Sequence, residues 1–350
     1  CRAKPDLQSM RIAIVNDLSL AREVLRRLVL SVPGYSVAWF AEDGDEAIKK
    51  TATDCPDVIL MDLVMPRVNG VEATCTIMKQ TPCPILVVTS TVKGHYDLAI
   101  AAINAGALDA VETPILATGG TIQNGQPLLN RLAKLADANR GVTYSGLRVP
   151  LRPKAPPCDA PPLVIIGSST GGPDALATVL AAFPQRFPAA ILIAQHIAAE
   201  FAPTLATWLG ERCTLPVRTA RAGDSPTAGT VLLAESNDHL EIGSDHKVRY
   251  TASPRQYPYR PSIDVLFESA AAIWPRLGVG VLLTGMGSDG ADGLLRLRGL
   301  GWHTIAQDES TCVVYGMPKA AAEKQAATEI LPLSQIGPTI AAKILGKKLR

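Results

Sequence analysis

The stretch from residue 163 to residue 180 constrains the fold of this chain more than any other. It opens with four apolar, mostly β-branched residues, Leu163 to Ile166, which is the pattern of a buried strand. Glycines and small hydroxyl residues follow, and Pro173 suits the first position of a helix, where its missing N–H costs nothing. Apolar residues then recur at helical spacing up to Leu180. The stretch therefore predicts a strand, a sharp turn and a helix.

A serine stands at the bend of this unit. Residues 167–171 read G-x-S-x-G, an elbow pattern that places the third residue, Ser169, above the sheet. The helix behind it would offer N–H groups and partial positive charge to an oxyanion. An ordinary turn after a parallel strand stays open as an alternative. A dinucleotide loop would need G-x-G-x-x-G and an acid after the next strand, but the apolar run 189–194 ends in Gln195-His196.

Composition limits the classes of protein to consider. The 350 residues suffice for two domains, and 47% hydrophobic and 19% charged residues indicate a globular, soluble chain. A net charge of +2 gives no argument for nucleic acid or for an anionic membrane. Seven cysteines without a C-x-x-C pair favour reduced thiols and a cytoplasmic location. No run has membrane-spanning length, no signal segment opens the chain, and residues 1–9 carry no pattern.

Strand-like and helix-like segments alternate through the first part of the chain. Five such βα units predict an α/β domain with a parallel sheet and helices on both faces. A proline-rich stretch follows and is typical of a semi-rigid spacer. We therefore expect a first domain over 10–140, a linker over 141–161 and a second, doubly wound α/β domain over 162–350.

Three strands of the first domain end in residues suited to phosphoryl chemistry. Asp17 and Asp62 each follow a strand, and Thr89 follows another. Ligands bind beyond the carboxyl ends of strands in such sheets. Mg²⁺ takes one or two carboxylates together with phosphate oxygens, and a carboxylate can itself form an aspartyl-phosphate. Because Asp is frequent in loops after strands, each acid alone means little, but the three strand ends together favour a phosphoryl site.

These residues resemble the receiver domain of response regulators, which is flavodoxin-like. The resemblance implies Asp62 as phosphoacceptor, Asp17 and Asp62 as ligands of Mg²⁺, and Thr89 as the switch hydroxyl. The motifs that carry the resemblance are Ile14-Val15-Asn16-Asp17, Val58 to Pro66 with Asn69-Gly70, Val88-Thr89-Ser90 and Gly106 to Asp109.

The receiver motif is incomplete at three positions. Asn16 stands where receivers usually have a second acid, Thr113 where they have a phosphate-contacting lysine, and Ala110 where many have an aromatic switch residue. The departures concern the strength of phosphate binding and its signalling, not the fold. The missing lysine and the Asn16-Asp17 pair resemble the branch that serves Wsp-type surface sensing rather than flagellar chemotaxis.

Three strand ends of the second domain carry Ser169, His196 and Asp289. A serine becomes a strong nucleophile when a base takes its proton, and a carboxylate fixes the tautomer of that base. The loop Gly285-Met286-Gly287 can bring N–H groups to an oxyanion. An ordinary turn, with Asp289 capping the next helix, is the alternative. His239 lies in polar surroundings and is expected at the surface.

The second half resembles the catalytic domain of the CheB family of chemotaxis protein-glutamate methylesterases. The resemblance implies Ser169 as nucleophile, His196 as base and Asp289 as its orienting acid, with Thr170 and Met286 lining the site and no cofactor for the ester hydrolysis. It implies release of methanol from glutamate γ-methyl esters, and also deamidation of glutamines. Its motifs are Ile166 to Gly172, Ala194-Gln195-His196, Arg260 to Phe267, Leu283 to Ala291 and Tyr315 to Pro318.

The resemblance also implies partners. These are the cytoplasmic domain of a methyl-accepting chemoreceptor and a histidine kinase of the CheA type, with no nucleic acid and no membrane insertion. A DNA-binding output is disfavoured because the second half lacks a helix-turn-helix pattern and a basic stripe. The alternative is a non-catalytic regulator that binds a receptor or kinase on an esterase scaffold.

Overall fold

The structure is a computed structural model of the chain and describes residues 9–89, 96–117, 121–138, 160–255, 257 and 259–346. The chain divides into two compact units, Cys1–Val142 and Thr143–Arg350. Each unit is treated by itself. The linker predicted over 141–161 lies outside the described residues, apart from residues 160 and 161.

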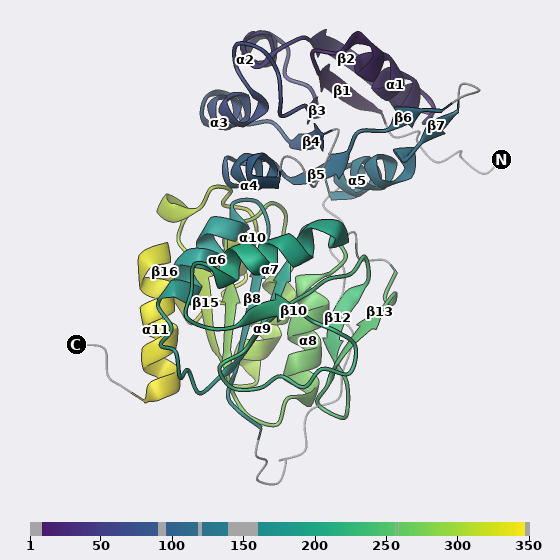
Figure 1. The fold of residues 1–350 in the computed structure, drawn as a ribbon. Helices are drawn as coiled ribbons and strands as arrows, with labels where there is room; N and C mark the ends of the chain where they lie inside the picture. Colours follow the sequence, from purple (N-terminus) through teal and green to yellow (C-terminus); the bar gives the residue numbers. More distant parts are fainter. Residues whose placement is uncertain are drawn as a thin grey trace, which may run out of the picture. The chain divides into compact units, whose positions relative to one another are not determined.

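The first unit is a five-stranded parallel sheet with helices on both faces (Figure 1). Its strand order is β2-β1-β3-β4-β5. The elements are β1 (Met10–Val15), α1 (Ser19–Leu30), β2 (Tyr35–Ala41), α2 (Gly44–Thr53), β3 (Val58–Met61), α3 (Gly70–Gln80), β4 (Ile85–Thr89), α4 (Tyr96–Asn104), β5 (Asp109–Glu112), β6 (Ile115–Leu116), β7 (Ile122–Gln123) and α5 (Gly125–Ala138).

Local sequence explains why the helices of this unit begin where they do. The side chains of Asp43 and Asn69 accept the N–H groups of Glu46 and Glu72, at 2.9 and 3.0 Å, and so cap α2 and α3. Apolar residues of α1 and α5 cover one face of the sheet in a single core. The predicted parallel sheet is confirmed. The short antiparallel pair β6–β7 is not predicted, since two residues a strand leave no periodicity to read.

The second unit is built on a seven-stranded parallel sheet in the order β10-β11-β9-β8-β14-β15-β16, with a separate antiparallel pair, β12–β13. Its elements are β8 (Leu163–Ser168), α6 (Gly172–Ala181), β9 (Ala190–Gln195), η1 (Ala199–Phe201), α7 (Ala202–Gly210), β10 (Val217–Thr219), β11 (Val231–Leu233), β12 (His239–Ile242), β13 (Val248–Thr251), α8 (Ile263–Ile273), β14 (Val279–Leu282), α9 (Ala291–Gly299), β15 (His303–Gln307), η2 (Glu309–Thr311), α10 (Met317–Glu323), β16 (Glu329–Leu331) and α11 (Leu333–Leu345).

The order of the strands explains where a ligand would bind. β8 lies between β9 and β14, so the chain leaves β8 in one direction and later returns on its other side. Such a reversal opens a crevice beyond the carboxyl ends of the strands. The register pairs Ser168 with Gln195 and Gly167 with Leu282. The residues that follow these three strands are therefore neighbours in space.

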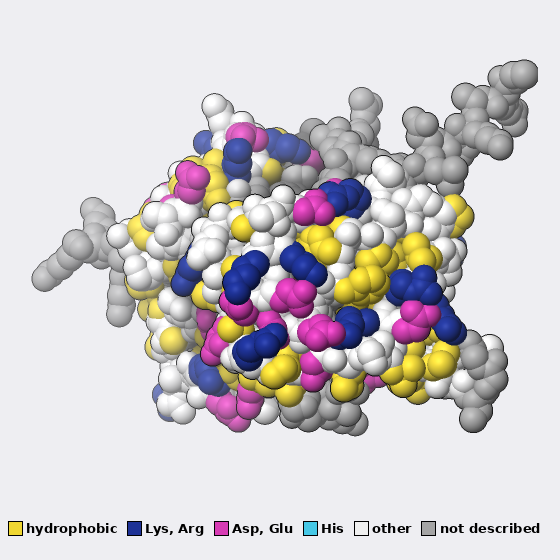
Figure 2. Space-filling model, turned by 90° about the horizontal axis from the view of Figure 1, so that it is seen from above, with side chains coloured by type: hydrophobic (Ala, Val, Ile, Leu, Met, Phe, Trp, Pro, Cys, Tyr) yellow, Lys and Arg dark blue, Asp and Glu magenta, His cyan; other side chains and the backbone are white. Residues whose placement is uncertain are grey.

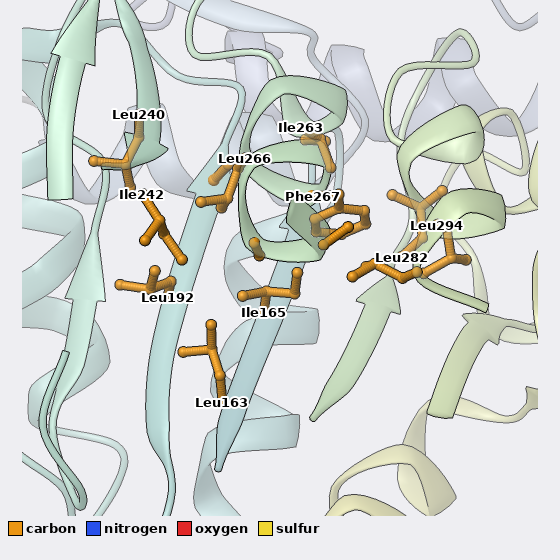
Figure 3. Close-up of a cluster of buried hydrophobic side chains, with 14 of the residues drawn as sticks. Leu163, Ile165, Leu192, Leu240, Ile242, Ile263, Leu266, Phe267, Leu282 and Leu294 are labelled. Atoms are coloured by element: carbon orange, nitrogen blue, oxygen red, sulfur yellow. The ribbon is translucent and has the colours of Figure 1, made fainter. Parts of the chain in front are cut away.

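One face of this sheet is covered by α8 and α9. Figure 3 shows Leu163, Ile165 and Leu192 of the sheet facing Leu266 and Phe267 of α8. Leu163 and Ile165, at alternate positions of β8, contribute to this cluster, and the whole strand is buried. Burying a large apolar side chain contributes about 1.5–3 kcal/mol, so this packing fixes α8 firmly against the strands.

Some sequence expectations for this unit are wrong. The pattern of residues 312–315 predicts a short strand, but η2 precedes these residues and only Tyr315 pairs, in an isolated bridge with Gly285. The strands β10 and β16 were not expected, because three residues each carry too little pattern. His239 is fully buried, not at the surface. Within the described parts of the chain, no helix is long and apolar enough to cross a membrane.

Candidate active site

The turn after β8 has the elbow geometry that its sequence predicts. Gly171 has a φ of +75°, a conformation that favours glycine, and Pro173 lies in the first turn of α6. The N–H of Ser169 donates to the carbonyl of Thr284 at 3.0 Å, and the N–H of Gly172 donates back to the carbonyl of Ser169 at 2.8 Å. The serine is therefore held at a sharp bend between β8 and α6.

The side chain of Gln195 ties this bend to the neighbouring strand. The hydroxyl of Ser168 donates to Gln195 Oε1 at 2.6 Å, and Gln195 Nε2 donates to the carbonyls of Ser169 and His196 at 2.8 and 3.2 Å. A Cβ on Gly172 would stand 2.0 Å from Gln195 Oε1, so only glycine leaves room for the amide. These contacts fix Ser169 and His196 relative to each other.

The structure brings His196 and Asp289 into direct contact. Nε2 of His196 lies 2.7 Å from Oδ2 of Asp289. The other ring nitrogen, Nδ1, is buried and has no hydrogen-bond partner among the described residues. The N–H of His196 also donates to the carbonyl of Ser168 at 3.0 Å. Nδ1 is therefore the nitrogen left to receive a proton from a neighbouring hydroxyl.

Asp289 is held by the start of α8. Its Oδ1 accepts the hydroxyl of Ser262 at 2.8 Å and the N–H of Asp264 at 3.1 Å, while Oδ2 accepts the N–H of Ile263 at 2.8 Å. Burial alone would raise the pKa of Asp289, but the hydrogen bond and charge of His196 and these N–H groups lower it below its usual value. Asp289 therefore carries the charge. It does not cap α9, whose N-cap is Gly290.

A second acid, Asp264, lies directly beside it. Burial, and then the negative charge of Asp289, raise the pKa of Asp264 well above its usual value. Its carboxyl group accepts the N–H of Gly293 at 2.7 Å and so joins α8 to α9. The pKa values of the two neighbouring acids are thus shifted in opposite directions.

Two side chains of the site were missed by the sequence reasoning. Tyr259 stacks on His196, with ring centroids 4.3 Å apart. Burial, together with the charge of Asp289, raises the pKa of Tyr259 to about 12, so the phenol stays neutral. His239 accepts the N–H of Ser262 at Nδ1, at 3.1 Å, and thereby holds the N-cap residue that contacts Asp289. Neither residue stands at the end of a parallel strand, the position from which the sequence predicts site residues.

The loop after β14 closes the other side of the serine. A Cβ on Gly285 would lie 2.6 Å from the Cβ of Ser169, so only glycine permits this approach. The N–H of Gly285 donates to the carbonyl of Val314 at 3.0 Å, so it is not available to a substrate. For Thr170 and Met286, no backbone N–H partner occurs in the described part of the chain, and Thr170 Oγ1 is buried without one.

A buried glutamate behind the site makes stability depend on pH. Glu268 is 5% exposed, and burial, opposed by the charge of Arg296, raises its pKa from 4.5 to about 7. Between these values the folded chain holds a proton that the unfolded chain releases. The contribution of Glu268 to the free energy of unfolding is thus largest below about pH 4.5, and it is lost as the pH rises through 7.

We expect the substitution Glu268→Gln to remove this loss. The difference in unfolding free energy between the variant and the original chain should rise by about 2 kcal/mol, in favour of the variant, from about pH 5 to about pH 8. Denaturant unfolding at the two pH values measures the difference. Glu323→Gln, at an exposed position, is the control and should show no such gain. An equal pH dependence in Glu268→Gln and the original chain would contradict the assignment.

In the first unit, the structure places Asp62 directly after β3 and beside the end of β1. Asn16 Nδ2 donates to Asp62 Oδ2 at 2.9 Å, and the N–H of Leu63 donates to Oδ1 at 2.7 Å. Thr89 Oγ1 is buried and has no hydrogen-bond partner within the described ranges. The N–H of Thr113 donates to the carbonyl of Thr89 at 2.9 Å, so residue 113 lies beside the expected switch hydroxyl.

The donor set at this edge fits a magnesium ion with few protein ligands. Asp17 follows β1 and Asp62 follows the neighbouring strand β3, and Mg²⁺ is commonly held by one or two carboxylates together with water and phosphate oxygens. Asn16 turns an amide donor, not a carboxylate, toward Asp62. No group of three or more His, Cys, Asp or Glu side chains in the described residues is arranged to hold a metal ion.

The fold and the two sites define a class of protein. A receiver-type unit comes first in the chain, and a doubly wound α/β unit with serine, histidine and aspartate at adjoining strand ends follows. This is the organisation of a response regulator with an enzymatic output unit. The family model described as response regulator receiver domain matches residues 12–118, and the model described as CheB methylesterase matches residues 164–340.

Similar proteins cover nearly the whole chain. A protein of Bordetella avium named protein-glutamate methylesterase/protein-glutamine glutaminase 1 is 51% identical, over 95% of this chain and 96% of that protein. A relative of the same name, without the number, from Mesorhizobium japonicum is 50% identical over 95% and 98%. The catalytic domain of the Thermotoga maritima CheB methylesterase is 35% identical, with a TM-score of 0.50, over 53% of this chain and 99% of that domain. The chain belongs to the CheB methylesterase family.

Proposed function

We propose that this chain is a phosphorylation-regulated protein-glutamate methylesterase that uses Ser169 as its nucleophile. The reaction is hydrolysis of glutamate γ-methyl esters on methyl-accepting chemoreceptors, with release of methanol. The names of the relatives support this reaction. The observation that carries the site is the contact between His196 Nε2 and Asp289 at 2.7 Å beside a serine elbow. The domains assigned are 10–140, the linker 141–161 and 162–350.

The side chains divide the work of acyl transfer. Ser169 Oγ attacks the ester carbonyl while His196 takes its proton at Nδ1, the nitrogen without a partner among the described residues. Asp289 keeps the Nε2 proton in place and stabilises the imidazolium that forms. The imidazolium then protonates the leaving methoxide, and a water molecule hydrolyses the acyl-enzyme by the same route in reverse order.

Backbone donors stabilise the negative charge that develops on the carbonyl oxygen. The N–H groups of Thr170 and Met286 flank Ser169 from two strand ends, and each lacks a partner within the described residues. The start of α6 adds partial positive charge behind the serine. One such donor is worth about 2.7–4 kcal/mol in the transition state. Thr170 and Met286 are therefore assigned to the substrate side of the site.

The same site supports deamidation of receptor glutamines. A glutamine side chain offers the same carbonyl to Ser169, and the leaving group is ammonia in place of methanol. Both reactions are acyl transfer to water and need no cofactor. The relatives carry both activities in their names, protein-glutamate methylesterase and protein-glutamine glutaminase.

The first unit is assigned the control of this activity. Asp62 accepts phosphate from a histidine kinase of the CheA type, Asp17 and Asp62 hold Mg²⁺, and Thr89 is the switch hydroxyl. Mg²⁺ supplies positive charge against the phosphoryl oxygens. The buried Thr89 Oγ1, without a partner in the described residues, supports its role as a group that waits for one. Thr113 in place of lysine removes a charge-assisted contact of about 1.5–3 kcal/mol.

The surface agrees with protein partners rather than nucleic acid. Basic and acidic side chains are interspersed over the face seen in Figure 2. The net charge of the chain is +2. The proposed partners are the cytoplasmic domain of a methyl-accepting chemoreceptor and its kinase, and the proposed location is the cytoplasm.

We expect the unphosphorylated first domain to inhibit the esterase. Methanol release from methylated receptor membranes should be slower for the full chain than for a fragment of residues 160–350. A small-molecule phosphodonor with Mg²⁺ should raise the rate of the full chain toward that of the fragment, because the new charge draws Thr89 and nearby loops inward. Asp62→Asn should abolish the response to the phosphodonor.

Two results would contradict this model of control. A fragment no faster than the unphosphorylated full chain would show that the first domain does not inhibit the esterase. A response to phosphodonor that persists in Asp62→Asn would show that Asp62 is not the phosphoacceptor. Release of methanol by neither form, from receptor that a related methylesterase does demethylate, would favour a non-catalytic regulator instead.

A further inference from the structure

Two cysteines of the first unit lie beside the same carbonyl oxygen. The thiols of Cys55 and Cys83 donate to the carbonyl of Pro56, with Sγ–O distances of 3.7 and 3.3 Å. The two sulfur atoms are therefore no farther apart than the sum of these distances. Cys55 precedes β3 and Cys83 precedes β4, and these strands pair in parallel with Ile59 opposite Ile85. The fold thus brings together two thiols that are far apart in sequence.

The two thiols differ in exposure, and each affects the other. Cys55 is exposed, whereas Cys83 is 2% exposed. Burial, and then the charge and hydrogen bonding of Cys55, raise the pKa of the Cys83 thiol. The carbonyl of Pro84 also accepts from Cys83, at 3.7 Å. Cys55 is hence the thiol that a dissolved oxidant reaches, and Cys83 is a protected thiol beside it.

The loop that carries Cys55 is held in place by its neighbours. The guanidinium of Arg11 donates to both carboxylate oxygens of Asp54 at 2.7 Å and to the carbonyl of Cys55 at 3.4 Å. The N–H of Arg11 donates to Asp57 at 2.6 Å, and Trp39 Nε1 donates to the carbonyl of Asp54 at 2.8 Å. The proximity of the thiols is therefore a property of the folded loop.

We propose that Cys55 and Cys83 are a redox-sensitive thiol pair that peroxides convert to an intrachain disulfide. The Cys55 thiolate attacks hydrogen peroxide, which breaks the O–O bond and gives a sulfenic acid and, after protonation, water. The Cys83 sulfur then attacks the Cys55 sulfur, its proton leaves with the hydroxyl group as a second water, and the S–S bond forms. Two thiols are oxidised and one peroxide is reduced.

The modification would join the amino ends of β3 and β4. Asp62 and Thr89 stand at the carboxyl ends of these two strands. The pair is thus separate from the proposed phosphorylation site and requires neither phosphate nor the esterase. The inference stands whether or not the proposed function holds.

The test is a peptide map of the full chain after treatment with hydrogen peroxide. Free thiols are first blocked with an alkylating agent under denaturing conditions, and the digest is analysed without reduction. The expected result is a cross-linked peptide containing Cys55 and Cys83, lighter by two hydrogen atoms than its two parts and lost on reduction. The described cysteines at 75, 213 and 312 should remain alkylated.

The variant Cys83→Ser separates the two steps. It should stop at the Cys55 sulfenic acid, so that labelling of Cys55 by dimedone rises several-fold over the original chain. Three results would overturn the proposal: full alkylation of both cysteines after peroxide, over-oxidation of Cys55 with Cys83 unchanged, or a disulfide from Cys55 to another cysteine. The map of the original chain decides the matter even if the variant does not fold.

Discussion

Replacing Ser169 by alanine should lower the rate of methanol release on the order of 10⁴- to 10⁶-fold, with the chain still folded. The substitution removes the hydroxyl that stands at the bend between β8 and α6, and no covalent intermediate can then form. The backbone contacts of residue 169, to Thr284 and Gly172, do not involve the side chain and remain. The measurement is methanol released from methylated receptor membranes, with circular dichroism to confirm the fold.

The adjacent serine provides a matched control. Ser168→Ala removes a buried hydrogen bond to Gln195 Oε1, so the free energy of unfolding should fall by about 1–2 kcal/mol. Most of the esterase activity should remain, because Ser168 lies within β8 and its hydroxyl is already engaged. If Ser168→Ala were inactive and Ser169→Ala active, the nucleophile would be misassigned.

Replacing Asp289 by asparagine should lower the rate by about 10³- to 10⁴-fold. Every group that faces the carboxylate donates to it: His196, the Ser262 hydroxyl and the N–H groups of Ile263 and Asp264. An amide must turn its NH₂ toward one pair of these donors. With the NH₂ group at the position of Oδ2, Nε2 of His196 must accept a hydrogen bond, so the ring proton moves to Nδ1. Nδ1 can then no longer accept the serine proton. With the NH₂ group at the position of Oδ1, two donors face each other, the amide and the N–H of Asp264.

The neighbouring acid Asp292 gives the control for this substitution. Asp292 lies in the first turn of α9 and pairs with Lys324 at 2.5 Å. Asp292→Asn should keep the rate within about threefold of the original chain, since this half-buried ion pair takes no part in the contacts of His196 and Asp289. Comparable losses in Asp289→Asn and Asp292→Asn would show a general effect of charge and would contradict the role given to Asp289.

The strand ends were predictable because the sheet is parallel. Ser169, His196 and Asp289 each follow a strand or a strand-adjoining loop with a strong apolar pattern, and carboxyl ends of parallel strands meet at one edge. The same reasoning placed Asp62 after β3 and Thr89 at the end of β4. Periodicity and the position of polar residues after strands were therefore sufficient for these side chains.

Other parts of the site depend on packing that leaves no local pattern. His239 was expected at the surface because polar residues surround it in the sequence, but β12 packs against α8 and buries it next to Ser262. Tyr259 reaches His196 from an irregular segment. The donation of α8 to Asp289 joins residues 26 positions apart, which no spacing rule connects. The proximity of Cys55 and Cys83 likewise depends on the fold and leaves no local sequence pattern.

We expect this chain to transfer a glutamyl group from its methyl ester to water through Ser169. Methylated receptor membranes incubated with the full chain in heavy-oxygen water test it most directly, with mass spectrometry of receptor peptides and methanol. The prediction is loss of methyl groups at glutamyl residues, heavy oxygen in the new carboxylates, ordinary oxygen in the methanol, and none of this with Ser169→Ala. Heavy oxygen in the methanol, or equal demethylation by Ser169→Ala, would contradict the claim.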